Sequence, residues 1–183
     1  DQMGMTRVME DVNSVERVLI DGILALAWPT PGEARPWLVG IHRGGARLAR
    51  ELADAIALSE GWRPPVGTID VTLHRDDTFL QRPQLSGART DLPGDPSGQR
   101  IVLIDDVLHT GRTVRAALNE LLDFGRPEAV RLAVLLDRGG RELPVAADVI
   151  GQACTVPAGA RIELVYGDDG RIRGAEFRNH RTP

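Results

Sequence analysis

Lysine is absent from this chain of 183 residues, and all 22 of its basic side chains belong to arginine. A chain without lysine has no side chain for Schiff-base catalysis and none for the lysine of a Walker-type phosphate loop. Arginine can still bind phosphate groups through two parallel hydrogen bonds. The absence therefore excludes lysine chemistry and leaves phosphate recognition open.

Cysteine, aromatic residues and long apolar runs are also scarce. The single Cys154 cannot form a disulfide within the chain, and aromatic residues make up 4% of it. No apolar run approaches the roughly 20 residues that a membrane-spanning helix needs, so we expect no membrane partner. The first residues lack a basic region followed by an apolar run, so we expect no signal peptide and a cytoplasmic location. A net charge of −4 is not typical of a general nucleic-acid binder.

The patterns along the chain predict alternating strands and helices. Hydrophobic residues make up 42% of the sequence, which is enough for the core of one domain spanning residues 1–183. Apolar periodicity predicts helices at 12–27, 46–58 and 114–122. Strands are expected at 37–41, 67–73, 101–104, 130–136, 149–150, 162–166 and 171–177. Such an alternation is typical of an α/β fold with a mainly parallel sheet flanked by helices.

Three smaller features complete this outline. Asn13 or Ser14 is the expected cap of the first helix. Residues 76–98 form a polar stretch rich in proline, glycine and aspartate, and loops of this length are often active-site lids. The C-terminal arginines are expected to form a solvated basic tail; they are Arg171, Arg173, Arg178 and Arg181.

The most informative segment runs from Ile101 to Thr113. Its first four residues predict a buried strand, and Asp105 and Asp106 follow at the carboxyl end of that strand. A Thr-Gly loop then leads into a helix, whose first N–H groups are unpaired and suit a phosphate. Ligands of open α/β sheets bind beyond the carboxyl ends of the strands. Because two carboxylates suit hydroxyl groups, the segment predicts a site for a sugar phosphate.

Residues 101–113 resemble the phosphoribosyl diphosphate (PRPP) binding signature of the type I phosphoribosyltransferases. Further segments narrow the resemblance to the PyrR subgroup, which couples uracil phosphoribosyltransferase activity to the regulation of pyrimidine genes, in some members by binding mRNA. These segments are Leu38–Ile41, Ile69–Asp77, Val107–Ala117, Asp123–Pro127, Ala133–Gly139 and Arg141–Asp148. The resemblance implies the type I phosphoribosyltransferase fold, with a small hood from about residues 1–36 and 150–183. It also implies a homodimer or a larger homo-oligomer.

The resemblance further implies roles for individual residues. Asp105 and Asp106 would hold the ribose hydroxyls and stabilise positive charge on the sugar ring. Arg75 would be catalytic and, with Asp76 and Asp77, would begin a lid that excludes water. Mg²⁺ would bind mainly through substrate oxygens and water, so no protein ligand is assigned to it. The implied residues for binding PRPP and UMP are Arg43, Gly44, Asp105, Asp106, Val107, Leu108, His109, Thr110, Gly111, Arg112, Thr113, Arg141 and Val165.

Two alternatives stay open. His109 stands where many type I enzymes have an acid and is one candidate for the general base; the other is ionisation of uracil N1 with help from solvent or backbone contacts. The implied partners are PRPP, uracil or UMP, and an mRNA leader. The alternative function is a nucleotide-sensing regulator that binds mRNA with little catalysis. Residues 152–160 contain no cation, and phosphate contacts from cations supply much of the affinity for RNA.

Overall fold

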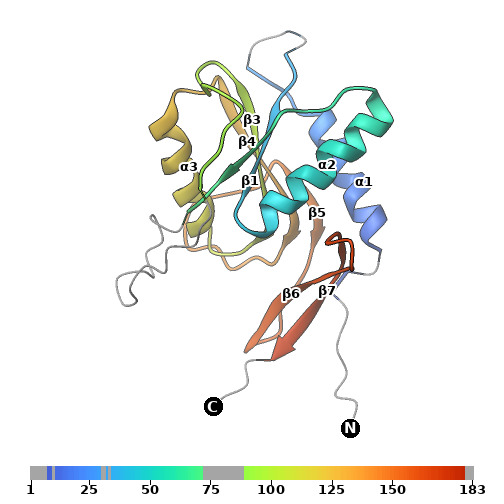
Figure 1. Ribbon diagram of the computed structural model, residues 1–183. Coiled ribbons are helices and arrows are strands. Elements are labelled where there is room, and N and C mark those ends of the chain that lie inside the picture. Colours follow the sequence, from blue (N-terminus) through green and yellow to red (C-terminus); the bar gives the residue numbers. More distant parts are fainter. Residues whose placement is uncertain (1–7, 10, 30–31, 33, 72–88, 180–183) are drawn as a thin grey trace.

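The computed structural model describes residues 8–9, 11–29, 32, 34–71 and 89–179 (Figure 1). The expected lid residues Arg75, Asp76 and Asp77 lie outside the described residues. No helix within the described ranges combines the length and the apolar character needed to cross a membrane.

The main sheet has five parallel strands, and aliphatic side chains fill both of its faces. Their order across the sheet is β2-β1-β3-β4-β5, which makes β3 the central strand. The strands are β1 (Trp37–Ile41), β2 (Val66–Ile69), β3 (Arg100–Leu108), β4 (Ala129–Asp137) and β5 (Val149–Ala153). Parallel strands covered on both faces are typical of α/β proteins, as the sequence predicts.

Helices cover the two faces of this sheet. Helices α1 (Val12–Leu24) and α2 (Gly44–Glu60) pack on one face, where Leu19 and Leu52 are fully buried. Helix α3 (Arg112–Phe124) packs on the opposite face through Leu121 (Figure 1). In the first part of β3, Val102 and Ile104 pack toward α2, and Ile101 and Leu103 pack toward α3. This alternation sends neighbouring residues of the strand to opposite faces of the sheet.

Several element boundaries differ from the sequence-based predictions. Helix α1 ends at Leu24, three residues early, and its cap is Asp11, whose carboxylate accepts a hydrogen bond from the N–H of Asn13 at 3.0 Å. The prediction of Asn13 or Ser14 as the cap is wrong because both residues are already helical. Strand β2 ends at Ile69, whereas the prediction extended this strand to residue 73. Asp70 and Val71, the last residues described before the segment 72–88, are not in a strand. Strand β3 continues through both of its acids to Leu108.

An antiparallel hairpin stands apart from the main sheet. It is formed by β6 (Ala160–Tyr166) and β7 (Ile172–Asn179), and it lies at the lower end of the molecule, beside the start of α2 (Figure 1). Helix α1 and strand β5 belong to the main sheet and its cover, so the part that stands apart is smaller than the predicted hood of residues 1–36 and 150–183. The arginines predicted to form a solvated tail are partly in a strand: Arg173 and Arg178 belong to β7, are exposed, and pair with Asp169 and Glu163, whereas Arg181 lies outside the described residues.

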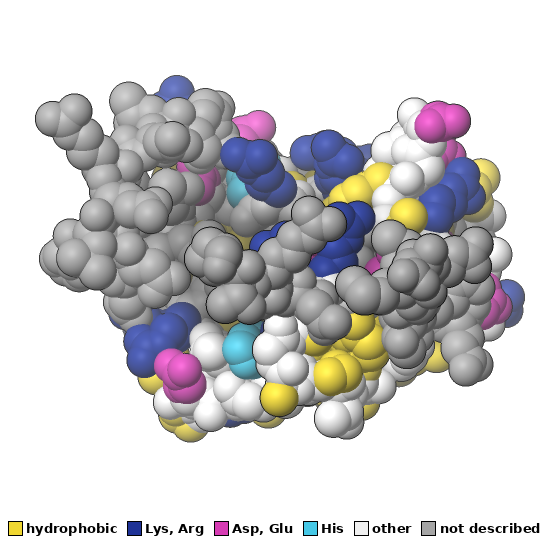
Figure 2. Space-filling model, turned by 90° about the horizontal axis from the view of Figure 1, so that it is seen from below, with side chains coloured by type: hydrophobic (Ala, Val, Ile, Leu, Met, Phe, Trp, Pro, Cys, Tyr) yellow, Lys and Arg dark blue, Asp and Glu magenta, His cyan; other side chains and the backbone are white. Residues whose placement is uncertain are grey.

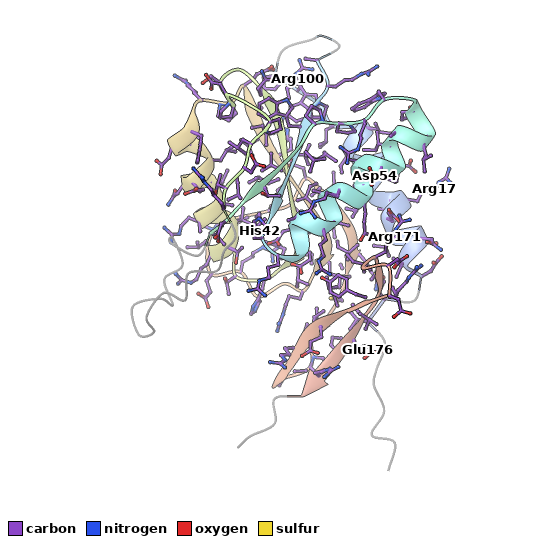
Figure 3. All side chains as sticks on the ribbon, viewed as in Figure 1. Arg17, His42, Asp54, Arg100, Arg171 and Glu176 are labelled. Atoms are coloured by element: carbon purple, nitrogen blue, oxygen red, sulfur yellow. The ribbon has the colours of Figure 1, made fainter. Side chains whose placement is uncertain are left out.

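The hairpin is fixed to the core where α1 and α2 meet. The N–H of Val8 donates to the carbonyl of Ala175 at 2.9 Å, and Ile172 is buried among the side chains of both helices. Arg171 lies at this junction (Figure 3), with a guanidinium nitrogen 3.9 Å from the Glu16 carboxylate. The carboxylate of Glu51 accepts a hydrogen bond from the N–H of Ile172. Helix α2 therefore packs against both the hairpin and one face of the main sheet.

The two ends of the undescribed segment 72–88 leave from neighbouring points of the fold. Thr68 and Asp91 exchange two backbone hydrogen bonds, of 2.7 and 2.9 Å. The N–H of Asp70 also donates to the hydroxyl of Thr90 at 3.1 Å. These bonds form a closed stem beside β2.

Replacing the half-buried Glu51 by glutamine tests the electrostatics of this junction. Burial raises the pKa of Glu51 above its ordinary value, against the opposing hydrogen bond from Ile172. Because the folded state favours the protonated form, the stability is greatest below the unfolded pKa of about 4.3 and falls as the pH rises through the raised folded pKa. Glu51→Gln should therefore raise the melting temperature by about 2 °C at pH 7.5, with no gain at pH 4.

Thermal unfolding followed by circular dichroism at the two pH values measures this difference. Glu60→Gln is the matched control, since it removes a carboxylate from the exposed end of the same helix. It should change the melting temperature less than Glu51→Gln does at pH 7.5. A lower melting temperature of Glu51→Gln at pH 7.5 would contradict the expected cost of the buried charge.

Candidate active site

The site lies at the carboxyl edge of the main sheet. Arg100, which begins β3, and His42, which follows β1, mark the two opposite edges of the sheet (Figure 3). Arginine side chains gather over the middle of the edge that carries the hairpin (Figure 2). The predicted binding residues of β3 and of the loops after β1 and β3 meet at this edge.

Asp105 and Asp106 point to opposite faces of the sheet. Asp105 is only 6% exposed and lines a cavity on the α3 side, whereas Asp106 lies against Gly44 on the α2 side. Each carboxylate accepts a hydrogen bond from the next backbone N–H, at 2.9 Å for Asp105 and 2.8 Å for Asp106. The sequence places both acids after the strand, but the structure extends β3 through them, and this extension separates their directions.

The loop of residues 109–113 encloses a cavity of about 470 Å³ together with Asp105. Gly111 caps α3 with a φ of 91°, a left-handed conformation that glycine adopts without steric cost. A Cβ at Gly111 would also lie 3.1 Å from the side chain of Val145. The cavity is lined by the start of α3, where N–H groups without helical partners favour an anion.

Arg141 supports the loop of residues 109–113 through hydrogen bonds. Its guanidinium donates to the carbonyl oxygens of His109 and Val145, both at 2.9 Å, and to the Asp137 carboxylate at 2.6 Å. Burial of Asp137 would raise its pKa, but the hydrogen bonds from Arg141 and from the N–H of Gly139 outweigh it and lower the pKa. The substrate contact predicted for Arg141 stays a prediction; its hydrogen bonds give it a role in holding the loop.

The second loop of the site joins β1 to α2. Helix α2 starts with Gly44 and Gly45, and the peptide bond between His42 and Arg43 is cis. A Cβ at Gly44 would overlap the Asp106 carboxylate, and one at Gly45 would overlap the carbonyl of Ile104. Glycine is needed at both positions because the start of α2 touches the end of β3. Arg43 is exposed beside them.

His109 sits at the exposed rim of the cavity, with its ring close to Gly140. Burial lowers its pKa, Arg138 and Arg141 lower it further, and Glu142 opposes them. The imidazole is therefore neutral at neutral pH, the form that can accept a proton. This supports one of the two alternatives for the general base, and both stay open.

Tyr166 was not predicted from the sequence and lies at this edge. It is the only tyrosine of the chain, and it ends β6 next to the predicted Val165. Burial raises the pKa of the Tyr166 phenol, and the nearby Asp106 carboxylate raises it further. The sequence offered only the rarity of tyrosine as a signal. No cluster of three potential metal ligands occurs among the described residues.

Comparison with known proteins identifies the fold and the family. A model of the phosphoribosyl transferase domain matches residues 19–162. The hypoxanthine phosphoribosyltransferase of Trypanosoma cruzi superposes with a TM-score of 0.63 at 17% identity, covering 94% of this chain and 95% of that one. A structure of HGPRT-ase from Leishmania tarentolae in complex with GMP superposes with a TM-score of 0.63 at 16% identity, covering 98% of both chains. These structures confirm the predicted type I phosphoribosyltransferase fold.

Relatives found by sequence comparison have a higher identity to this chain than these two structures. The bifunctional protein PyrR of Roseiflexus sp. (strain RS-1) is 43% identical over 173 residues, which are 94% of each chain. The bifunctional protein PyrR of Halalkalibacterium halodurans is 42% identical over 165 residues, covering 88% of this chain and 89% of that protein. The chain therefore belongs to the phosphoribosyl transferase family and, within it, to the PyrR proteins.

Proposed function

We propose that this protein is a uracil phosphoribosyltransferase, which converts uracil and PRPP to UMP and pyrophosphate. The observation that carries the proposal is the arrangement at the carboxyl edge. Asp105 and Asp106 face opposite sides of β3, and each side leads to the start of a helix, at Gly111 for α3 and at Gly44 for α2. A ribose that carries a phosphate at one end and a pyrophosphate at the other suits this arrangement.

Each part of PRPP then has a chemical partner. The 5′-phosphate lies in the cavity formed by residues 109–113, and the pyrophosphate lies at Arg43 and Gly44. The ribose hydroxyls lie between them, at the two carboxylates. The bond from C1 to pyrophosphate breaks and the bond from C1 to uracil N1 forms, while the carboxylates stabilise the positive charge that develops on the sugar.

Mg²⁺ fits this site as a substrate-bound ion. The hard carboxylate oxygens of Asp105 and Asp106 suit Mg²⁺, which usually keeps several waters and substrate oxygens as ligands. When bound, Mg²⁺ would neutralise charge on the pyrophosphate that leaves. The N1 proton of uracil passes to His109 or to solvent, the two alternatives described above. The closing of a lid that begins at Arg75, Asp76 and Asp77 stays a prediction, as does the base contact of Val165.

Regulation of pyrimidine genes through an mRNA leader is the second candidate function. It rests on the membership of the chain among proteins named bifunctional. A homodimer or larger assembly and a cytoplasmic location complete the proposal. A regulator without catalysis would bind UMP and give no turnover, which separates the two candidates by experiment.

The first experiment measures UMP formation from radiolabelled uracil and PRPP with Mg²⁺. Hypoxanthine, guanine and orotate serve as parallel substrates. We expect turnover on uracil and none on the other three bases. Turnover on a purine alone would contradict the choice of base, and binding of UMP without turnover on any base would favour the regulator.

The double variant Asp105→Asn and Asp106→Asn tests the carboxylate pair. Both side chains lose their charge and keep their size, so we expect a folded protein with turnover reduced by at least about 100-fold, because electrostatic stabilisation of the transition state is lost. Steady-state assays give the rate, and circular dichroism confirms the fold. Normal turnover in the folded double variant would remove the proposed roles of both acids.

Gly44→Ala tests the closeness of α2 to Asp106. The added methyl group overlaps the carboxylate and must displace it, and a shift of about 1 Å in a positioned group can cost about 100-fold in rate. The matched control is Gly94→Ala, since a Cβ there meets only Trp37 at an ordinary 3.8 Å. We expect a large loss of turnover in the first variant and almost none in the second. Equal turnover in the two variants would show that the position of Asp106 is not critical.

A further inference from the structure

Arg47 and Tyr166 form a contact between α2 and the hairpin, at the edge of the active site. Arg47 follows the glycine pair at the start of α2, and its guanidinium carbon lies 4.9 Å from the centroid of the Tyr166 ring. A guanidinium over an aromatic face at this distance is attracted by the ring. Both side chains are exposed, Tyr166 to 37%, so a ligand can reach them.

The same tyrosine connects this contact to the acid pair. The Asp106 carboxylate and the Arg47 guanidinium are both close enough to act on the phenol of Tyr166, in opposite directions. Tyr166 also follows a register shift between β6 and β7, and such irregularities redirect a side chain. Tyr166 therefore lies beside Arg47 and within electrostatic range of Asp106, which is on the α2 side of β3.

The hydrogen-bonding edge of Arg47 is open to a ligand. Across the described parts of the chain, Arg47 has no side-chain hydrogen bond and no ion pair. Arg112 and Arg141 at the same edge are instead engaged by Glu142 and Asp137. Stacking on a ring occupies the face of a guanidinium and leaves its N–H groups, which lie in the plane, directed outward. Such an arrangement suits two-point binding of a phosphate group.

We propose that Arg47, held in place by the ring of Tyr166, binds the pyrophosphate group of PRPP; this rests on the function proposed above. The position of Arg47 selects this group over the other parts of the substrate. The 5′-phosphate cavity lies on the α3 side with Asp105, whereas Arg47 lies on the α2 side with Asp106 and Gly44. Pyrophosphate also has the highest density of negative charge in the substrate. Arg47 is then a binding residue, and Tyr166 is its positioning residue.

Comparing PRPP with UMP tests this role, because UMP shares the ribose and the 5′-phosphate but has no pyrophosphate. Arg47→Gln should raise the Kd of PRPP measured by calorimetry with Mg²⁺ about tenfold, the usual loss for a hydrogen bond to a charged group, and leave the Kd of UMP within about twofold. The loss should shrink at high ionic strength, because the contact is exposed to solvent. Arg47→Lys keeps the charge without the planar stack and should give an intermediate loss.

Variants of Tyr166 test the positioning role. Tyr166→Phe keeps the ring and should bind PRPP as the parent does, whereas Tyr166→Leu should lose part of the affinity for PRPP and none for UMP. Arg50→Gln removes an exposed arginine one turn further along α2 and is the matched control, with no expected change.

Three results would overturn the inference. An unchanged PRPP affinity in Arg47→Gln would exclude the contact. An equal loss for PRPP and UMP would assign Arg47 to the ribose or the base. A loss in Tyr166→Leu confined to UMP would make the ring a wall of the base site. A parent protein that binds neither PRPP nor UMP would contradict the proposed function itself, so the two failures are distinguishable.

Discussion

The start of α2 touches the end of β3 at a place where no side chain fits between them. A Cβ at Gly45 would overlap the carbonyl of Ile104, and a Cβ at Gly40 would overlap the backbone of Gly45. Because backbone meets backbone here, the position of α2 along the strands is set without adjustable side chains. Asp106 is held against Gly44 by the same approach. The hairpin depends on it too, since it is attached to α2 through Glu51 and Arg47.

Strand β3 divides the site into two halves that share a backbone. Asp105 belongs to the half with the loop of residues 109–113, and Asp106 to the half with the loop after β1. Each half has its own supports: Arg141 braces the first loop, and the glycine contacts fix the second. The two adjacent acids can therefore serve different parts of one ligand.

The sequence predicted the parts of the fold that depend on local pattern. The aliphatic runs of β1 and β4 and the periodicity of α2 gave their elements correctly, because burial on both faces of a sheet or on one face of a helix leaves a direct pattern.

Features that depend on tertiary contacts were missed or displaced. The cap of α1 is Asp11 because its carboxylate accepts a hydrogen bond from the N–H of Asn13. Several neighbouring polar residues can cap a helix, and the sequence alone does not show which of them makes this bond. The position of Tyr166 is set by the packing of the hairpin against α2. Arg141 donates hydrogen bonds to the backbone carbonyls of Val145 and His109. Such contacts join residues far apart in sequence, so no local pattern records them.

The backbone hydrogen bonds between Thr68 and Asp91 hold together the two ends of the segment 72–88. Since Thr68 and Asp91 are already joined, the spacing of the two ends is set by backbone bonds that lie outside residues 72–88. The place of β2 beside β1, and of β1 beside the acid-bearing strand β3, is thereby fixed by contacts among residues on either side of that segment.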